Sequence, residues 1–399
     1  MDSSEALFKR HFGYTPYCKT KAPGVVELLG SFAGIVDGLA LTIAIEKSLT
    51  ISASPRLDGK VEIISSSFPN DVQRFWITEN FTAQNLNWQD FIKSLIYQLH
   101  RHSAGVGGFN ASIHSEVPIK VGFESSASLL CAMALTIRKL YPFRLTETGT
   151  MLYPPRRDRY GKVEPPNKKE KMSIAVLCKN SELTLAGEKA DIIPELTSLF
   201  AKKYYAMCVD CRFNSYEYVP IFGEIAIVAF VIEELANSSL DYIADLRKLA
   251  IETSKALLTK SLRSVDLQYL KSCGKKLTQR QFNFAYHVAS EIQRVIYAGK
   301  ALEDGDFEQF GQYMIMSYES TKELIGFFPK ELDLLVKLCL NQNGCYGSRA
   351  IVSRTPSTVI SIVSADEYEN FIKTVPKQFY EKTNLSVKTL ICVPSDGAE

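Results

Sequence analysis

Apolar residues recur along the chain at two spacings, and these spacings predict its elements. Continuous or alternating apolar runs predict strands, and recurrence every three to four residues predicts helices. An apolar, β-branched run from Gly38 is followed by Asp58-Gly59 and a second such run, which predicts a β-hairpin. The other elements expected early in the chain are an amphipathic helix at the N-terminus, a helix over 88–102, a strand from 107 and a helix over 125–137.

The second half follows a different order. Strands over 206–211 and 225–232 come first, and helices are expected over 239–258, 280–303, 306–323 and 329–341. The last sixty residues predict strand, strand, helix and strand, over 346–353, 358–363, 365–380 and 387–393. This grouping predicts an α+β fold with two lobes, 1–200 and 201–399.

The composition is that of a globular chain without a general affinity for polyanions. Of 399 residues, 46% are hydrophobic and 23% charged, and the formal net charge is only +2. No signal sequence is expected, and the longest apolar run, Ile225–Ile232, is far shorter than the ~20 residues of a membrane-spanning helix. We therefore expect a cytoplasmic protein that binds neither nucleic acid nor membranes.

Nine cysteines without regular spacing are typical of reduced thiols rather than of a disulfide framework. Cys208 and Cys211 form a C-x-x-C, but no second pair completes a zinc site, so we interpret them as the end of a strand. Residues 153–171 carry four prolines and seven basic residues interrupted by acidic ones, which predicts a solvated surface loop.

The sequence "VPIKVGFESSASLL" from Val117 predicts a turn that leads into a helix beginning at Ser125. Small hydroxyl residues at a helix start leave main-chain N–H groups unpaired at the positive end of the helix dipole. Such a place suits a phosphate, although a serine there can simply be a helix cap.

Several collinear segments resemble galactokinases of the GHMP kinase superfamily. The segment 22–38, "APGVVELLGSFAGIVDG", is similar to A-P-G-R-V-N-L-I-G-E-H-T-D-Y-N-D-G, and 117–128 is similar to the phosphate loop V-P-x-G-x-G-L-S-S-S-A-S. The segment 187–212 resembles G-x-x-x-G-I-M-D-Q-F-x-S-L-F-G with a strand ending D-C-R. The helix over 287–311, "CYGSR" at 345–349 and "CVPSDGA" at 392–398 also follow the family.

The resemblance implies a GHMP-kinase fold: an N-terminal lobe like ribosomal protein S5, a C-terminal ferredoxin-like α/β sandwich, and a cleft between them. It also implies Mg-ATP-dependent phosphorylation of the anomeric hydroxyl of galactose. Nucleotide contacts are implied for the loop and helix start, at Gly122, Glu124, Ser125, Ser126, Ala127 and Ser128. Magnesium contacts are implied at Glu182 and Ser126.

The family's catalytic aspartate falls on Pro194, and its arginine partner falls on Val25. Proline cannot accept a proton from a hydroxyl, and valine cannot stabilise the charge of a transferring phosphate. Asp191 and Glu195 could supply a new base. Lys19 and Lys21 could supply a new cation.

The family's galactose contacts fall on Ser31, Phe32, Ala33 and Gly34, which with Asp37 and Tyr242 are expected to line a substrate cleft. A site that cannot pair a sugar's hydroxyls does not select that sugar.

The phosphate loop carries Lys120 at a family glycine and Glu124 at a family serine. A carboxylate at this helix start would repel phosphate, and we expect Glu124 to take the place of a nucleotide phosphate. A glycine-rich family segment reads "AIVSRTPST" at 350–358, without glycine. His287, on the helix resembling the family's, is expected to pack in the core.

Three functions are open at this point, of which the least favoured, ordinary galactokinase activity, requires that the residue matching above be shifted at several positions at once. In the first, the chain is a degenerate galactokinase homologue with a small-molecule ligand in its cleft, and with a binding or regulatory role that could include a protein partner. In the second, it is an active GHMP-type kinase that uses a rebuilt site.

Overall fold

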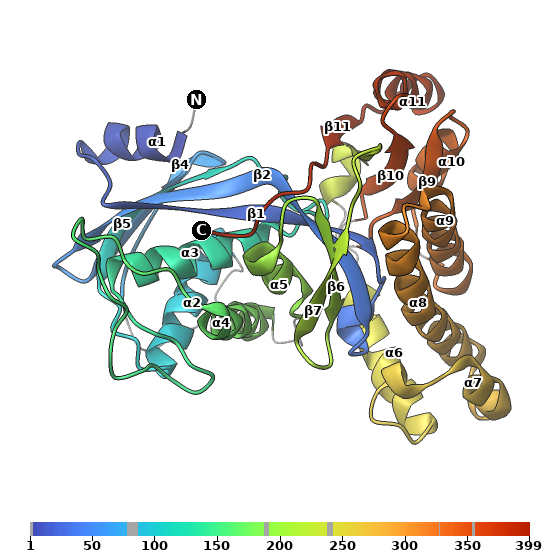
Figure 1. Ribbon diagram of the computed structural model, residues 1–399, viewed down its shortest axis with the longest axis horizontal. Helices are drawn as coiled ribbons and strands as arrows, with labels where there is room; N and C mark the ends of the chain where they lie inside the picture. The colour runs from blue at the N-terminus through green and yellow to red at the C-terminus, as the bar shows by residue number, and fades with distance from the viewer. Residues whose placement is uncertain (1–2, 78–86, 187–190, 238–241, 327, 353–355) are drawn as a thin grey trace.

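The computed structural model describes residues 3–77, 87–186, 191–237, 242–326, 328–352 and 356–399. Two β-sheets organise these residues into two lobes (Figure 1). The strands of the first sheet are β1 Cys18–Leu29, β2 Leu39–Arg56, β3 Lys60–Ser65, β4 Phe68–Trp76, β5 Gly108–Ser115, β6 Tyr205–Asp210 and β7 Ser215–Pro220. The strands of the second are β8 Ile225–Val231, β9 Cys345–Ala350, β10 Thr358–Ser364 and β11 Lys388–Ile391. The predicted two-lobed α+β fold is confirmed.

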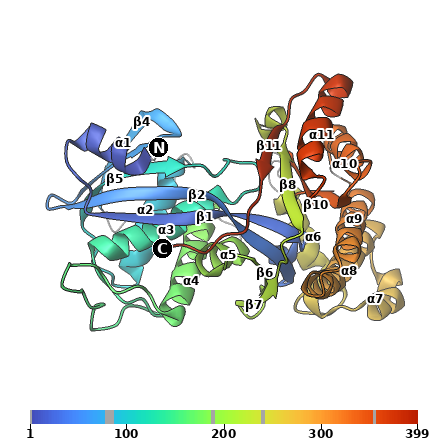
Figure 2. The ribbon, with the colours of Figure 1, turned by 45° about the horizontal axis from the view of Figure 1, so that its top comes forward.

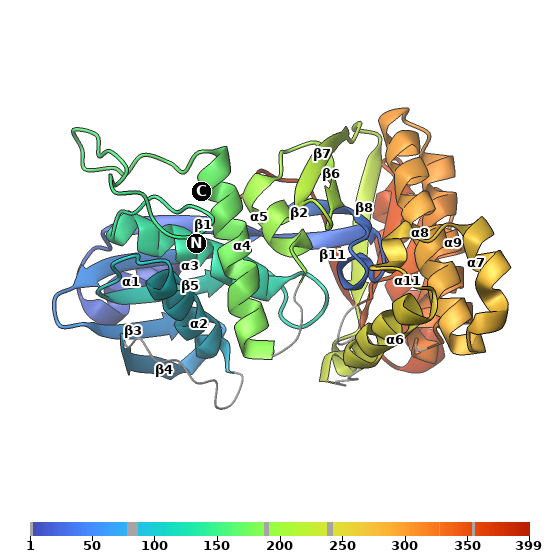
Figure 3. The ribbon, with the colours of Figure 1, turned by 90° about the horizontal axis from the view of Figure 1, so that it is seen from below.

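Helices cover both faces of the first sheet. The short helix α1, Ser3–Phe12, packs on β5 and β2, and the remaining helices of this lobe lie across the opposite face, as Figure 3 shows. These are α2 Trp88–Arg101, α3 Ser125–Leu140, α4 Lys168–Ala186 and α5 Ile193–Phe200. The helix of 88–102 and the helix beginning at Ser125 are thereby confirmed.

The predicted β-hairpin at Asp58-Gly59 is wrong. The turn exists, but the sheet order is β4-β3-β5-β2, so β5 lies between the two strands that the turn joins. Arg56 pairs with Gly108 at the start of β5, and a Cβ on Gly108 would collide with the backbone of Lys60. Because Gly108 has no side chain, the turn can pass directly over the first residue of β5.

The lobe boundary at residue 200 does not coincide with the division of the sheets. Strand β6 pairs with β2, and β7 pairs with β6, so residues 205–220 extend the first sheet. The second sheet begins at Ile225, which places the change between sheets after Pro220. The strand predicted at 225–232 is confirmed as β8.

The second sheet is buried on both faces, which joins the lobes into one body. Val228 and Phe230 of β8 pack with helices α10, Lys330–Leu340, and α11, Tyr368–Thr383. The alternate residues Ile227 and Ala229 belong to the large core that continues into the first lobe. Figure 2 shows β8, β10 and β11 between the first lobe and these helices.

Further helices complete the second lobe. They are α6 Tyr242–Ala256, α7 Leu267–Cys273, α8 Gln279–Glu303 and α9 Phe307–Leu324. The predictions for four helices and for the final strand, strand, helix and strand are confirmed, whereas α7 was not predicted. No helix in the described part of the chain is long and apolar enough to cross a membrane. All nine cysteines are free thiols.

The last residues of the chain return to the first lobe. After β11, the N–H of Ser395 donates to the carbonyl of Ala44 at 3.0 Å, and Glu399 exchanges two hydrogen bonds of 3.0 Å with Lys21 on β1. Segments from both ends of the chain, helix α1 and residues 395–399, therefore contact the first sheet.

Candidate functional site

Three residues in the turn before α3 have positive φ. The φ angles are 63° at Lys120, 84° at Gly122 and 51° at Glu124. This left-handed region costs a residue with a Cβ roughly 1–2 kcal/mol, whereas glycine adopts it freely. The turn therefore keeps a backbone shape that favours glycine, although two of the three positions carry long side chains.

Both lobes hold this turn in place. From the first lobe, the N–H of Val25 donates to the carbonyl of Phe123 at 3.1 Å. From the second lobe, Oγ1 of Thr358 donates to the carbonyl of Val121 at 2.7 Å. The position of the turn is therefore fixed by the packing of the lobes on each other.

The first turn of α3 presents unpaired donors. The N–H groups of Ser125, Ser126 and Ala127 have no hydrogen-bond partner among the described residues, which leaves them able to bind an anion. The Ser128 hydroxyl is buried and donates to main-chain carbonyls of β1 and of Glu124 at 2.8 and 3.2 Å, so it does not face this place. The Glu124 carboxylate accepts no capping hydrogen bond from the helix, and its role in place of a nucleotide phosphate stays a prediction.

Asp191 lies where the catalytic and sugar-binding positions meet. Pro194 stands in the first turn of α5, and Oδ1 of Asp191 accepts a hydrogen bond of 3.0 Å from the N–H of Ile193. A Cβ on Gly34 would collide with the Asp191 side chain. The carboxylate therefore rests against the turn that carries the family's sugar contacts.

Glu195 cannot act as the replacement base. Its side chain is fully buried, and neither carboxyl oxygen has a hydrogen-bond partner among the described residues. Burial, reinforced by the carboxylate of Glu182, raises the pKa of Glu195 well above its ordinary value. Glu182 itself is partly exposed on α4, and no group of three potential metal ligands is formed by the described residues.

The proposed replacement cation is also misplaced. Lys19 and Lys21 belong to β1, and four residues of strand, roughly 13 Å, separate Lys21 from Val25. Both lysines line a separate hollow of the first lobe. The structure does not bring them to the site.

The predicted sugar-contact residues 31–34 are buried rather than exposed in a cleft. Ser31, Phe32 and Ala33 retain 2%, 6% and 5% of their accessible surface. Phe32 packs against the rings of Phe284 and His287, with centroid distances of 6.1 and 5.5 Å. Phe32 therefore packs against helix α8, whereas the role of residues 31–34 in a substrate cleft stays a prediction.

Two other predicted cleft residues are placed only in part. Asp37 is partly exposed just after the 3-10 helix Ala33–Ile35, which agrees with a position at the edge of the site. Tyr242 begins α6, but the structure does not describe its side chain. Residues 353–355, which belong to the segment without the family glycines, also lie outside the described residues.

His287 and Glu291 on α8 form the polar part of this contact. Glu291 Oε1 accepts hydrogen bonds from the N–H groups of Gly30 and Ser31 at 3.0 and 3.2 Å, and Oε2 accepts one from Arg294 at 2.7 Å. Burial opposes ionisation of Glu291, but Arg294 and other cations outweigh it and lower its pKa to about 2. Burial lowers the pKa of His287 to about 4, and its packing role is confirmed.

Arg349 and Glu27 were not predicted as site residues. The buried guanidinium donates to the carbonyl of Leu28 at 3.0 Å and to the hydroxyl of Ser31, and its Nη2 lies 3.6 Å from Oε1 of Glu27. Burial raises the pKa of Glu27 to about 7; Arg349 opposes this rise, whereas Glu291 and Asp191 add to it. A charged residue inside the apolar run "VVELL" was the signal that could have identified Glu27.

The site thus gathers carboxyl groups where the family pattern has an arginine. Glu27 comes from β1, and Asp191 and Glu195 come from the start of α5. Mutual repulsion contributes to the raised pKa values of Glu27 and Glu195. This arrangement favours the protonated forms of Glu27 and Glu195 and disfavours the negative charge of a transferring phosphate.

Comparisons with known proteins agree with this fold. Residues 90–152 match the family described as GHMP kinases N-terminal domain. Galactokinase of Chloroflexus aurantiacus is 28% identical over 397 residues, which cover 98% of this chain and 95% of the relative. Galactokinase of Bos taurus is 28% identical over 381 residues, which cover 94% and 90%.

Solved structures show the same architecture. Lactococcus lactis galactokinase complexed with galactose has a TM-score of 0.86 at 21% identity, and covers 99% of this chain and 98% of its own. A mevalonate kinase has a TM-score of 0.63 at 17% identity over 95% of this chain and 99% of its own. The chain therefore contains a segment that matches the N-terminal domain of GHMP kinases, and it has the two-lobed α+β fold of these kinases that its sequence predicted. Over nearly its whole length it is similar in sequence to galactokinases, at 28% identity.

Proposed function

We propose that this chain is a galactokinase homologue that no longer transfers phosphate from ATP to galactose and that uses its fold for a binding or regulatory role. One observation carries the proposal: Pro194 occupies the first turn of α5, at the position of the family's catalytic aspartate. A proline side chain has no atom that can accept the proton of a sugar hydroxyl.

The charges around Pro194 support the same conclusion. Val25 is buried and apolar, so no cation stands at the family's arginine position. Phosphoryl transfer depends on cations that stabilise the charge of the transferring group. Glu27 and Asp191 instead add carboxyl groups, which oppose the approach of a phosphate.

ATP and magnesium belong to the proposal only as ligands that the family suggests. The N–H groups of Ser125, Ser126 and Ala127 would suit a phosphate, and Gly122 allows close approach of the backbone. Glu124 beside them carries a charge of the wrong sign for that ligand. Glu182 and Ser126 would have to hold magnesium with oxygens supplied by the nucleotide. We therefore propose weak nucleotide binding.

The second candidate function is phosphorylation of another small molecule with Asp191 as the base. The observation that favours it is the position of Asp191 against Gly34, where the family binds its sugar. The hydrogen bond from the N–H of Ile193 holds this carboxylate in one orientation. A base so placed would receive a proton from a substrate hydroxyl bound within hydrogen-bond distance of Asp191.

The test is a turnover assay with a matched variant. Purified protein is incubated with Mg-ATP and a panel of sugars and small alcohols, and ADP release and thermal stabilisation are followed together. We expect no sugar-dependent ADP release in the wild type. Turnover with galactose would refute the first proposal. Turnover on another substrate that disappears in Asp191→Asn, but persists in the exposed control Asp266→Asn, would establish the second.

The remaining parts of the proposal concern binding partners and cellular location. We propose a small-molecule ligand between the lobes, no nucleic-acid or membrane partner, and a cytoplasmic location, from the charge balance and the cysteine usage of the sequence. A protein partner would be consistent with a regulatory role.

A further inference from the structure

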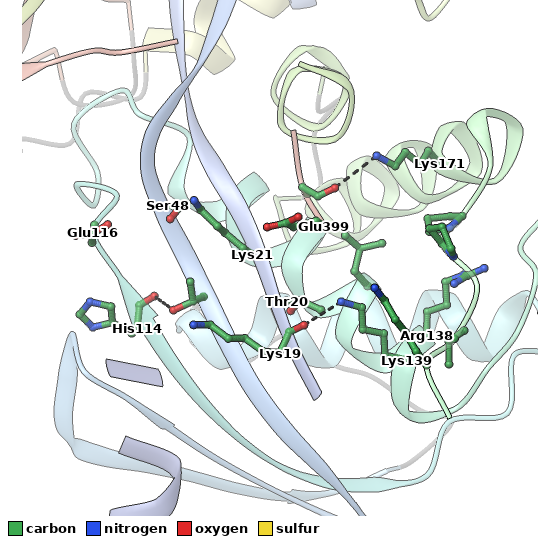
Figure 4. A pocket seen from close by; sticks show the side chains of 17 residues that line it. Lys19, Thr20, Lys21, Ser48, His114, Glu116, Arg138, Lys139, Lys171 and Glu399 are labelled. Carbon is green, nitrogen blue, oxygen red and sulfur yellow. Dashed lines mark hydrogen bonds between the residues drawn. The ribbon is translucent and has the colours of Figure 1, made fainter. Parts of the chain in front are cut away.

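A hollow of about 830 Å³ lies in the first lobe along the edge of β1 (Figure 4). Its size falls within the range of small-molecule sites, roughly 300–1,000 Å³. It is formed by β1, the end of α3, the loop before α4 and the last residues of the chain. The charged residues that matter for ligand binding are Lys19, Lys21, Lys139, Lys162, Lys171 and Glu399.

The hollow concentrates positive charge. Five lysines line it, against the two acidic residues Glu116 and Glu399, while the whole chain carries only +2. Lys19 and Lys21 stand two residues apart on β1, so they extend from the same face of the sheet. Such a local excess of one sign attracts an oppositely charged small molecule.

Lys139 and Lys171 are the partly buried members of the set. The ammonium of Lys139 donates to the carbonyl of Lys19 at 2.9 Å, and that of Lys171 donates to the carbonyl of Leu199 at 3.1 Å. Neither forms an ion pair with a carboxylate in the described part of the chain. Burial lowers the pKa of both ammonium groups, which a bound anion would reverse.

Apolar side chains also line the hollow. Leu135, Val163 and Pro165 contribute carbon surface to the hollow. Behind them, Nε of Arg138 and Oε1 of Glu170 form a buried ion pair of 2.8 Å that fixes α3 against α4. The hollow therefore combines cations with a surface suited to the organic part of a ligand.

The hollow is connected to the elements that carry the candidate site. Glu399 is paired with Lys21 on β1, the strand that also carries Val25 and Glu27. The N–H of Ala398 donates to the carbonyl of Ser198 at 2.7 Å, on the helix that begins beside Asp191. A ligand bound against residues 398–399 would therefore touch a segment that is hydrogen-bonded to both elements.

We propose that this hollow is a regulatory site for a phosphorylated small organic molecule with at least two negative charges. The phosphate groups contact Lys21, Lys139 and Lys171, and the organic part lies on Leu135 and Val163. The site is separate from the turn before α3, and the proposal holds whether or not the chain transfers phosphate.

The test uses isothermal titration calorimetry at constant ionic strength, with inorganic phosphate, pyrophosphate and fructose 1,6-bisphosphate as probes and neutral fructose as the blank. The site variant is Lys21→Gln with Lys162→Gln, two exposed side chains whose loss should not prevent folding. The matched control is Lys275→Gln with Lys276→Gln, an equal charge change at two exposed lysines of the second lobe. Lys120→Gln reports on binding at the turn before α3.

We expect the bisphosphate to bind saturably and more tightly than inorganic phosphate, and the site variant to weaken it about tenfold. The control and Lys120→Gln should leave its affinity unchanged. Lys171→Met should weaken binding further, with retained folding checked by circular dichroism. Absence of saturable binding, or equal losses in the site variant and the control, would overturn the proposal. Loss of binding in Lys120→Gln alone would also overturn it, by assigning the anion to the turn.

Discussion

Replacing Glu27 by glutamine tests whether the ionised carboxylate of Glu27 destabilises the folded protein. The carboxyl group lies 3.6 Å from the guanidinium of Arg349, so a simple view of the pair predicts that its loss destabilises the protein. The raised pKa predicts the opposite. Burial and the neighbouring carboxylates Glu291 and Asp191 outweigh the attraction of Arg349.

The magnitude follows from the shift of the pKa from 4.5 to about 7. One unit corresponds to about 1.4 kcal/mol, which gives an upper limit of about 3 kcal/mol. Because 23% of the Glu27 side chain remains exposed to solvent, we expect roughly 1–2 kcal/mol. The unfolded chain releases this proton at a lower pH than the folded protein does. The wild type therefore loses stability as the pH rises from 4.5 to about 7, and the loss is complete above that range.

The assay is scanning calorimetry of wild type and Glu27→Gln at pH 5 and pH 8. The variant should melt higher at pH 8, by about 1–2 °C for a chain of this length, and the difference should shrink at pH 5. Glu252→Gln, at an exposed position of α6, is the control and should show no such dependence. A variant that melts lower than the wild type at pH 8 would refute the reasoning, because it would show that the pairing with Arg349 dominates.

The remaining predictions concern the turn and the contact between β1 and α8. Lys120→Gly should raise the free energy of unfolding by up to about 1 kcal/mol, because relief of the positive φ exceeds the added entropy of the unfolded chain; a lower melting temperature would contradict this. Glu291→Ala should cost about 3–5 kcal/mol, measured by urea denaturation, because Arg294 is left buried without its partner. Glu303→Ala on the same helix removes an exposed pair with Lys300 and should cost less than about 1 kcal/mol; equal costs would show that burial of Glu291 is unimportant.

The sequence predicted those elements of the fold whose pattern is local. Helix α8 and the buried strand β8 were recognised because apolar spacing along one segment determines its type. Which strands pair with each other could not be predicted in this way, because strand pairing depends on residues far apart in the sequence. The turn at Asp58-Gly59 is equally compatible with adjacent strands and with strands separated by β5, and the apolar pattern of 205–220 does not specify which sheet it joins.

The residues of the candidate site also fall into those that the sequence identified and those that only the structure identified. Motif positions identified Pro194, Val25 and the turn before α3 from the sequence. The burial of Phe32 could not be predicted, because it depends on α8, about 250 residues further along the chain. Glu27 became a site residue only when folding brought it near Arg349 and Asp191.

The return of the C-terminal residues to the first lobe has a consequence for how the protein reaches its fold in the cell. Synthesis proceeds from the N-terminus, so β1 emerges long before Glu399, the residue that pairs with its edge at Lys21. Until Glu399 has been made, this pairing cannot form. The edge of β1 at Lys21 is therefore open to other strands or to chaperones during that time.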